Sequence, residues 1–500
     1  MDIKNKPLKL SIYSFILLAW AGSLLYLFSW NHIPHFTNSK AFSSIKKTGL
    51  SPISQWMGLY IGNKKIGYEY QQVVPQKNGF VFRERMFMRI MLMGHEKTIT
   101  TIVDSATDKD YFLRHISFSL KTSGMEMAAD GTVNGNILLI NLHGIGGNTQ
   151  ERYTLKKPVL SSDGIILKIV KDGFSRSEYN FHIFDPTVQQ ELPVNVRILG
   201  KAVKTILNNP VDTYKLEVTI KDMKETMFIT PQGETVEEIS PLGFRAVLEP
   251  KYMALTKGWG GENVDLISAT AIKAQGLTVT YPAQVTHMYA YMSGLSKDEF
   301  LPSIGFQTVQ SRLVDISATT HIGTYKLPYR ITKNSPLSIN DALNSNSIIN
   351  ADNPDIIALA KSILHGETDA KKAVELINRW VYTHVKDNFT VMIPRSIDLL
   401  KKPEGDCKAH TILFTALARA AGVPTKMAMG IVLMNDGYFY YHAWPLVYLD
   451  GWVPVDPTLG EFPADATHII LATGNLTNWM DILGVVGRLQ IDVMKIQTNQ

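Results

Sequence analysis

Apolar and polar residues alternate along short runs between about residues 56 and 250, and this two-residue period constrains the fold more than any other feature of the sequence. Such runs, separated by turn residues, are typical of antiparallel β-sheet, because successive side chains of a strand point to opposite faces. The first turns are indicated by Asn63-Lys64 and by Lys-Asn-Gly at 77–79. We therefore expect an antiparallel β domain at 51–250 and a further β-rich region at 251–345.

The glycine-rich sequence HGIGGN at 143–148 looks at first like a phosphate-binding loop. A dinucleotide-binding loop must open a helix, so that backbone N–H groups reach the phosphate. The residues that follow, TQERYTL, lack the apolar period of a helix start. The sequence therefore predicts a hairpin turn here.

The hydrophobic period changes after residue 350. Asn353 is a good N-cap and Pro354 suits the first helical position, so the sequence predicts a helix there. A second helix is expected from residue 369, followed by a loop, a helix at the cysteine and three strand-like runs up to about 457. We interpret 346–475 as a separate α+β domain and 476–500 as a C-terminal extension.

The N-terminal region has the composition of a membrane signal anchor. Three lysines, at positions 4, 6 and 9, precede an uncharged stretch at 11–30, which is long enough to cross roughly 30 Å of hydrocarbon. The positive flank is expected to stay in the cytoplasm, which puts the rest of the chain outside it. A cleaved signal peptide and a buried helix are the alternatives. Residues 1–30 are thus expected to form the cytoplasmic tail and anchor, and 31–50 a linker.

The only cysteine in 500 residues is Cys407, within EGDCKAHTILF at 404–414. A single cysteine excludes an intramolecular disulfide and a CxxC metal site. Asp406 is a good N-cap, which places Cys407 in the first turn of a helix that Gly422 and Pro424 would end. Backbone amides at a helix N-terminus favour a thiolate and can donate to an oxyanion, so the position suits a nucleophile. The alternative is an inert buried cysteine.

Two later residues fit the same chemistry. His442 lies in the strand-like run YFYYHAWPLVYL, and Asp456 lies in GWVPVDP. If these runs are neighbouring strands joined through Asp450-Gly451, the two side chains can lie side by side. A histidine base needs an acceptor that fixes its tautomer, and a cysteine nucleophile needs that histidine within hydrogen-bond reach. We also expect His442, as imidazolium, to lower the pKa of Cys407. A structural histidine and a turn aspartate are the alternatives.

The three blocks GDCKAHTILFTALARAAGVP, HAW and GWVPVDPT together resemble the transglutaminase-like superfamily, the circularly permuted relatives of papain-like thiol enzymes. The resemblance covers about 350–475. It implies that Cys407 is the nucleophile, His442 the general base and acid, and Asp456 the orienting carboxylate. The expected thiol chemistry requires no cofactor and no metal, and a calcium ion bound in a loop is the alternative. The β-rich region resembles the curved half-barrel sheets of bacterial envelope lipoprotein carriers.

The sequence as a whole predicts a membrane-anchored, periplasmic or otherwise extracytoplasmic cysteine enzyme, held in the inner membrane by one helix, that acts on protein or peptide amides through a thioester. Water as the acceptor would make it a peptidase or amidase, and an amine would make it a transglutaminase. The formal net charge of +5 is spread along the chain without a basic run, so nucleic-acid binding is not indicated. The alternative is a catalytically silent binding or assembly module of the cell envelope that uses its β-rich region.

Overall fold

The computed structural model describes residues 53–498 except 93, 123–124, 187–189, 221–222, 241–242, 257–264, 266, 268–269, 296–300, 319–321, 333–334, 336–338, 389–392 and 475–484. Within this part the chain divides into two compact units. The β unit comprises 53–144 and 148–265, and the C-terminal unit comprises 145–147 and 266–498. The predicted signal anchor and linker, residues 1–50, lie outside the described residues. None of the helices that the structure describes is long and apolar enough to cross a membrane.

The β unit is built on one 14-stranded antiparallel sheet, whose strand order is β8-β7-β6-β5-β4-β3-β2-β1-β14-β13-β12-β11-β10-β9. Neighbouring strands are consecutive in the sequence except for β1 and β14, whose pairing joins the two halves of the sheet. The strands are β1 Ile53–Ile61, β2 Lys64–Gln76, β3 Gly79–Leu92, β4 His95–Asp108, β5 Leu113–Thr122, β6 Met125–Asn134, β7 Ile137–Gly144, β8 Gly147–Thr154, β9 Glu178–Asp185, β10 Gln190–Ile206, β11 Asn209–Ile220, β12 Met223–Ile229, β13 Thr235–Ile239 and β14 Phe244–Leu248.

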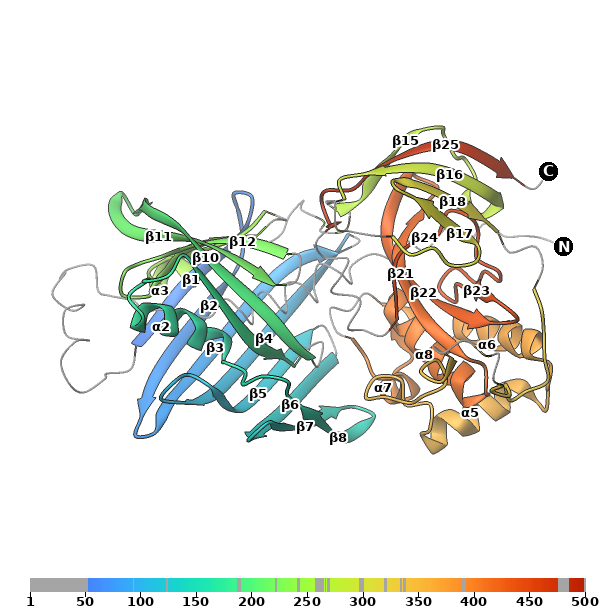
Figure 1. Cartoon of the computed structure of the whole chain (residues 1–500), viewed down its shortest axis with the longest axis horizontal. Helices are drawn as coiled ribbons and strands as arrows, with labels where there is room; N and C mark the ends of the chain where they lie inside the picture. Colours follow the sequence, from blue (N-terminus) through green and yellow to red (C-terminus); the bar gives the residue numbers. More distant parts are fainter. Residues whose placement is uncertain are drawn as a thin grey trace. The chain divides into compact units, whose positions relative to one another are not determined.

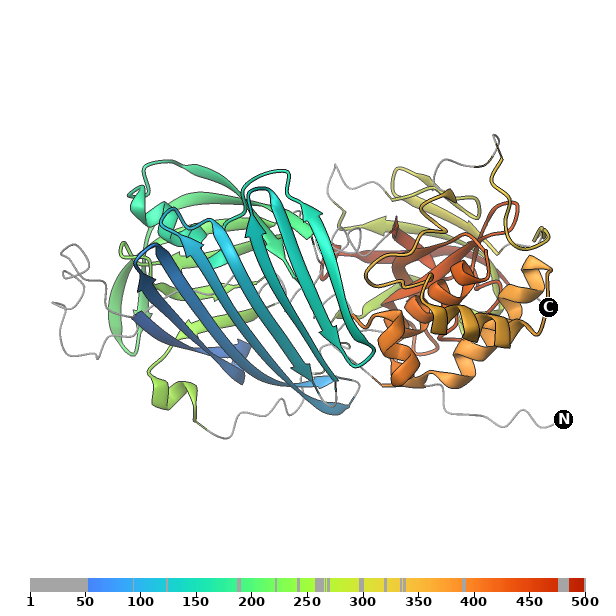
Figure 2. The same ribbon diagram turned by 90° about the horizontal axis from the view of Figure 1, so that it is seen from below.

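The sheet of the β unit is strongly curved, so that its β1–β8 half and its β9–β14 half turn toward each other (Figures 1 and 2). Two short helices belong to this unit, α2 (Ser162–Lys171) and α3 (Lys251–Ala254). The predicted antiparallel character is confirmed, since β1, β2 and β3 are consecutive hairpin strands. The second turn lies where the sequence predicts it, and the first lies one residue earlier than predicted, at Gly62-Asn63, because Lys64 already pairs with Ile61. The sequence at 143–148 is a hairpin turn between β7 and β8, as predicted.

Buried carboxylates line one face of this sheet. Glu69, Glu225 and Glu238 are almost fully buried, and they come from strands in both halves of the sheet. Burial raises the pKa of Glu69 to about 8 and raises that of Glu225 well above its ordinary value. The pKa of Glu238 is raised by burial and also by the charges of Glu225, Glu69 and Glu84. These acids therefore disfavour the folded unit once they ionise.

The neighbouring residue Glu237 has the opposite environment. It precedes Glu238 by one residue, so it faces the other side of the strand. Lys204 and Arg245 form ion pairs with its carboxylate. Burial acts to raise the pKa of Glu237, but hydrogen bonds from these two cations outweigh it and the pKa is lowered. Adjacent glutamates of one strand thus titrate in opposite directions.

The C-terminal unit packs helices against a second sheet (Figure 1). Its helices are α5 (Pro354–Leu364), α6 (Ala370–His384), α7 (Ser396–Lys401) and α8 (Cys407–Ala420), with a 3-10 turn at Pro282–Gln284. The Asn353 side chain accepts hydrogen bonds from the first amides of α5, which confirms the predicted cap. Helix α8 is buried along almost its whole length, so it forms the centre of this unit.

The sheet of the C-terminal unit has nine strands in the order β17-β18-β16-β25-β15-β22-β21-β24, with β23 paired to β22. Its strands are β15 Ile272–Gly276, β16 Val285–Ser293, β17 Gln307–Gln310, β18 Leu313–Ser317, β21 Thr425–Leu433, β22 Tyr438–Tyr448, β23 Trp452–Pro454, β24 Ile469–Gly474 and β25 Gln490–Thr498. Two two-residue strands, β19 (Lys386–Asp387) and β20 (Glu404–Gly405), pair separately. The segments 251–345 and 476–500, which the sequence sets apart, therefore contribute strands to the same sheet as β21 and β22.

We predict that Glu238→Gln stabilises the β unit at alkaline pH. A carboxyl whose pKa is raised on folding contributes stability below its unfolded pKa, and that contribution is lost as the pH rises through the folded value. Replacing Glu238 with the neutral glutamine removes this loss of stability. The gain in unfolding free energy should be about 1–3 kcal/mol, the usual cost of a buried polar group left without a hydrogen bond. Hydrogen exchange of β-unit peptides, compared between pH 6 and 9, measures the effect.

The matched control for this experiment is Glu237→Gln on the opposite face of the same strand. It removes the partner of two cations, so it should lower protection at neutral and alkaline pH instead. Equal responses of the two variants would contradict the assignment of opposite environments.

Candidate active site

Helix α8 begins at Cys407, as the sequence predicts. The Asp406 side chain accepts a hydrogen bond from the Lys408 backbone N–H at 3.0 Å, which caps the helix. The helix ends with Ala421 as the C-cap, and Gly422 follows with a φ of 85°. That conformation favours glycine, so the predicted stop is also confirmed. Cys407 therefore lies in the first turn, where the helix amides give a positive potential.

Hydrogen bonds hold the first turns of α8 against β22 next to His442. The Thr411 hydroxyl, one turn after Cys407, donates to the backbone oxygen of Ala443 at 3.0 Å. The backbone of Ala443 also hydrogen-bonds the Cys407 thiol. Both contacts involve the residue directly after His442, so the first turn of α8 packs on β22 next to the histidine, whose Nδ1 has no hydrogen-bond partner among the described residues.

His442 and Asp456 lie side by side, as the neighbouring-strand argument predicts. Strands β22 and β23 pair antiparallel, with Tyr448 opposite Trp452 across the turn. Asp456 follows β23 by two residues, and its Oδ2 is 2.6 Å from His442 Nε2. Both side chains are fully buried. Because the carboxylate can only accept, Nε2 carries the proton, and the second nitrogen, Nδ1, is then the basic atom of the ring.

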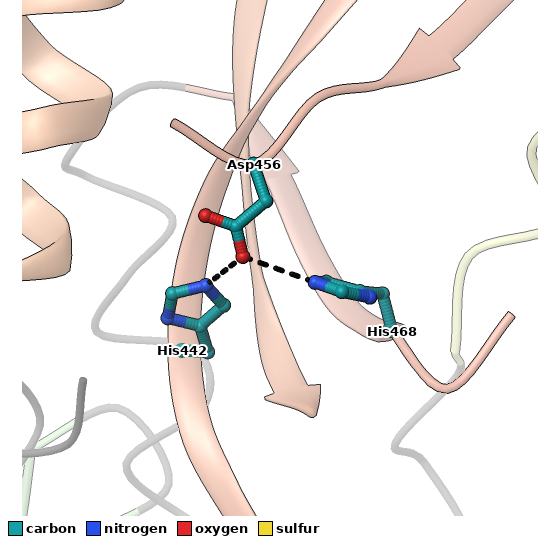
Figure 3. A group of neighbouring side chains, drawn as sticks. All are labelled: His442, Asp456 and His468. Atoms are coloured by element: carbon teal, nitrogen blue, oxygen red, sulfur yellow. Dashed lines mark hydrogen bonds and ion pairs between the residues drawn. The ribbon is translucent and has the colours of Figure 1, made fainter. Parts of the chain in front are cut away.

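The Asp456 carboxylate is held from two sides. Its Oδ1 accepts hydrogen bonds from the backbone N–H groups of Thr458 at 2.7 Å and Leu459 at 3.0 Å. Its Oδ2 accepts from His442 and also lies 3.1 Å from His468 Nε2 (Figure 3). Four donors thus fix one carboxylate in the core of the unit.

His468 is a residue of this site that the sequence interpretation missed. It lies directly before β24, and its side chain is fully buried. Its Nδ1 lies 3.2 Å from the backbone oxygen of Asp465 and 3.3 Å from Asp465 Oδ1. In the sequence it is a lone histidine before an apolar run, and no local pattern connects it to Asp456 twelve residues earlier.

Trp444 packs on both histidines. Its ring stacks on His442 with centroids 5.6 Å apart and meets His468 edge-on at 5.1 Å. Gly430, which lies opposite His442 on β21, makes this packing possible. A Cβ at Gly430 would come within 1.9 Å of the Ile469 backbone oxygen and 2.9 Å of the Trp444 ring. The absence of a side chain at Gly430 therefore sets the spacing of β21, β24 and Trp444.

The cysteine and histidine are both neutral in this arrangement, which differs from the expected thiolate–imidazolium pair. Burial raises the pKa of the Cys407 thiol well above its ordinary value, and the Asp406 carboxylate adds to this effect. Burial also lowers the pKa of His442, against the opposing charge of Asp456. The helix-end field and His442 do not compensate for the complete burial of Cys407, so the expected lowering of its pKa is not found.

The pKa values of the two carboxylates near the site, Asp456 and Asp406, are shifted in opposite directions. Burial acts to raise the pKa of Asp456, but the charges and hydrogen bonds of His442 and His468 outweigh it, and the pKa is lowered. Asp406 forms a fully buried ion pair with Lys408, 2.9 Å between Oδ2 and Nζ. Burial nevertheless raises the pKa of Asp406. A buried lysine next to the cysteine is a second feature that the sequence interpretation did not identify.

Among the described residues, two overlapping groups of side chains offer metal-type ligand atoms within 4.8 Å of one another: His442, Asp456 and His468, and Glu461, Asp465 and His468. In the first group both ring nitrogens lie at hydrogen-bond distance from the same carboxylate oxygen. A cation bound at this position would have to replace the proton in each of these two hydrogen bonds. The donor geometry is that of a hydrogen-bonded network around one carboxylate.

Comparison with known proteins agrees with this geometry. Residues 357–457, which include Cys407, His442 and Asp456, match the family model of the transglutaminase-like superfamily. A search of curated proteins found no match. The resemblance seen in the three sequence blocks is thereby confirmed for this part of the chain.

Three solved structures are similar at low levels. A β-barrel-like protein of a domain of unknown function from Brucella abortus has a TM-score of 0.33 and 11% identity, over 40% of this chain and 97% of that one. A candidate cysteine protease from Cytophaga hutchinsonii has a TM-score of 0.27 and 16% identity, over 43% and 85%. A candidate protease from Parabacteroides distasonis has a TM-score of 0.19 and 8% identity, over 66% and 64%. Similarities of this size do not assign an activity.

We predict that alkylation of Cys407 by iodoacetamide in the folded protein rises with pH without a plateau near neutrality. The buried thiol has a raised pKa, so its midpoint should lie above that of a free thiol, about 8.5. Mass spectrometry of the Cys407 peptide measures the rate, with the same protein unfolded in urea as the control. A plateau at neutral pH would instead show a preformed thiolate–imidazolium pair.

Proposed function

We propose that this chain, whose residues 357–457 match the transglutaminase-like superfamily, is a membrane-anchored cysteine enzyme that transfers the acyl group of a protein or peptide amide outside the cytoplasm. The observation that carries the proposal is the geometry around His442. Asp456 binds its Nε2 at 2.6 Å, and its Nδ1 has no hydrogen-bond partner among the described residues. Cys407 meets the same strand one residue later, at Ala443.

In the first half-reaction the Cys407 sulfur attacks the amide carbonyl carbon as His442 Nδ1 takes the thiol proton. Since both groups are neutral at rest, proton transfer accompanies the attack and does not precede it. Asp456 stabilises the imidazolium that forms, without taking its proton. The tetrahedral oxyanion collapses, the C–N bond breaks, and His442 returns the proton to the leaving amine. The product is a thioester on Cys407.

In the second half-reaction an acceptor attacks the thioester. Water, deprotonated by His442, releases a carboxylic acid and restores the thiol. An amine in place of water forms a new amide. Both outcomes share the triad, so the acceptor depends on which molecule reaches the thioester. We propose hydrolysis, which makes the protein a peptidase or amidase. The chemistry of these steps uses side chains of the chain alone.

We predict that the protein hydrolyses p-nitrophenyl acetate, a small activated ester that needs little recognition. Cys407→Ala should abolish turnover, and His442→Ala should lower it by roughly 10²–10⁴-fold, the usual contribution of a general base. Release of p-nitrophenolate and the mass of an acetylated Cys407 peptide report the two half-reactions. His384→Ala is the matched control, because that histidine is exposed on α6 and stacks on Trp380.

One result of this experiment would contradict the proposed enzyme activity. Equal turnover by the wild type and Cys407→Ala would show that the thiol is not a nucleophile, and the role of a binding or assembly module would replace that of an enzyme. If turnover depends on Cys407, incubation with a peptide mixture and dansylcadaverine distinguishes the acceptors. New carboxyl groups support hydrolysis, and incorporation of the fluorescent amine into peptides supports transamidation.

The location of the enzyme is a separate part of the proposal. It is supported by the three lysines before the uncharged segment 11–30. We predict that alkaline phosphatase, which folds only outside the cytoplasm, is active when fused after residue 50. A β-galactosidase fusion at the same position should be inactive. The reverse pattern would contradict an extracytoplasmic location and leave the chemistry of the site unaffected.

A further inference from the structure

Both ring nitrogens of His468 face acceptors. Nε2 lies 3.1 Å from Asp456 Oδ2, and Nδ1 lies 3.2 Å from the Asp465 backbone oxygen and 3.3 Å from its Oδ1. A neutral imidazole carries one N–H and would leave one nitrogen lone pair directed at an oxygen lone pair. An imidazolium satisfies both contacts, and it places one positive charge between two carboxylates.

His442, on the other side of the same carboxylate, is different. Its Nε2 faces Asp456, while its Nδ1 faces no hydrogen-bond partner among the described residues. It therefore needs a single proton, on Nε2. The two histidines share Asp456 Oδ2 (Figure 3). Their surroundings thus assign them different protonation states: one is a base and the other a fixed cation.

We propose that His468 is a positioning residue of this site: its imidazolium, held between Asp456 and Asp465, keeps the Asp456 carboxylate ionised and directed at His442 Nε2. The inference rests on the proposed function, because it concerns the same cysteine chemistry. His468 touches no reacting atom in it. It acts through Asp456, which in turn fixes the tautomer of His442.

The positioning works because Oδ2 has one donor on each side. Oδ1 is already bound to the Thr458 and Leu459 amides, so the carboxylate cannot turn without losing a hydrogen bond. Without His468 the buried carboxylate would lose a charged donor, and its desolvation would be offset by His442 alone. Asp456 would then take up a proton more readily or draw His442 toward the imidazolium, and the base at Nδ1 would be lost.

The charges around His468 keep it protonated over a wide pH range. Burial acts to lower its pKa, but Asp465, Asp456 and Glu461 outweigh this effect, and its pKa is raised well above the ordinary value. His442 is a further titratable neighbour among the described residues, 5.9 Å away between ring centroids. Trp444 covers the ring edge-on and carries no charge. Asp465 is the partner whose removal should lower this pKa most directly.

The test uses turnover of p-nitrophenyl acetate by the full chain as a function of pH. Activity needs the His468 cation, so kcat should fall as the pH rises through the raised His468 pKa. Asp465→Asn leaves the His468 ring in place and removes one carboxylate. It should move this falling limb to lower pH by roughly 1–3 units, the usual effect of a neighbouring charge. An unmoved limb would overturn the proposal, because a residue that only fills space has no such dependence.

A double-mutant cycle identifies the route of the effect. His468→Gln keeps a donor toward Asp456 without the charge, and it should lower kcat by roughly 10–100-fold with KM nearly unchanged, as loss of an outer hydrogen-bond partner does in other buried sites. In the Asp456→Asn background the same change should cost less than about twofold, because the carboxylate it acts on is gone. Equal factors in both backgrounds would show a structural role and contradict the proposal.

Two controls separate this inference from the proposed function. Wild-type turnover that requires Cys407 establishes the enzyme chemistry, whatever His468 does. His384→Gln is the same substitution at an exposed histidine of α6 and should leave kcat and the pH profile unchanged. Hydrogen exchange of peptides from α8 and β22 shows whether each variant keeps its fold. A loss of kcat in His468→Gln with unchanged protection supports positioning, and a loss that tracks lost protection contradicts it.

Discussion

The arrangement of the candidate site depends on one buried carboxylate. Asp456 accepts two backbone hydrogen bonds at Oδ1 and two histidine hydrogen bonds at Oδ2, and it has no exposed surface. Such a charge is unfavourable in a protein core unless its donors are all in place. The loop after β23, the middle of β22 and the residue before β24 must therefore be correctly positioned together. The folding of the unit and the geometry of its base are coupled through this group.

The elements around Asp456 also account for the central place of α8. The helix is buried on nearly every side, and Thr411 attaches it to the backbone of β22 at Ala443. On the adjacent strand, β21, Gly430 has no side chain, so the Trp444 ring and the β24 backbone can both approach it closely. Cysteine, histidine and carboxylate thus come from a helix, a strand and a loop whose mutual positions are set by packing. Rigid supporting elements of this kind are what a site for proton transfer requires.

The parts of the site that follow local rules could be predicted from the sequence. Asp406 before Cys407 indicates the helix start, and Asp450-Gly451 indicates the turn that brings Asp456 to His442. His468 could not be predicted in the same way, because its partners are brought to it by the loop between β23 and β24. The joining of β15 and β25 to β22 is equally long-range, since Ile272 pairs with Phe439 across more than 160 residues. Local pattern does not contain such pairings.

The protonation of the site shows why the sequence argument about reactivity was incomplete. A helix N-terminus and a neighbouring histidine both favour a thiolate, but each is a modest effect compared with the removal of a charged sulfur from water. In the structure Cys407 and His442 are buried, and burial raises the pKa of the thiol and lowers that of His442, so both groups are neutral.

A buried carboxylate of the β unit has a pKa shift opposite to that of Asp456, and the comparison identifies the cause of each shift. Glu238 is buried, and its pKa is raised by that burial and also by the charges of nearby glutamates. Asp456 is buried too, yet its pKa is lowered, because both of its oxygens have donors and one donor is a cation. Burial alone therefore does not decide whether an interior acid is charged. The partners decide it, and in the C-terminal unit His468 is the partner that lets a carboxylate stay ionised beside a neutral histidine base.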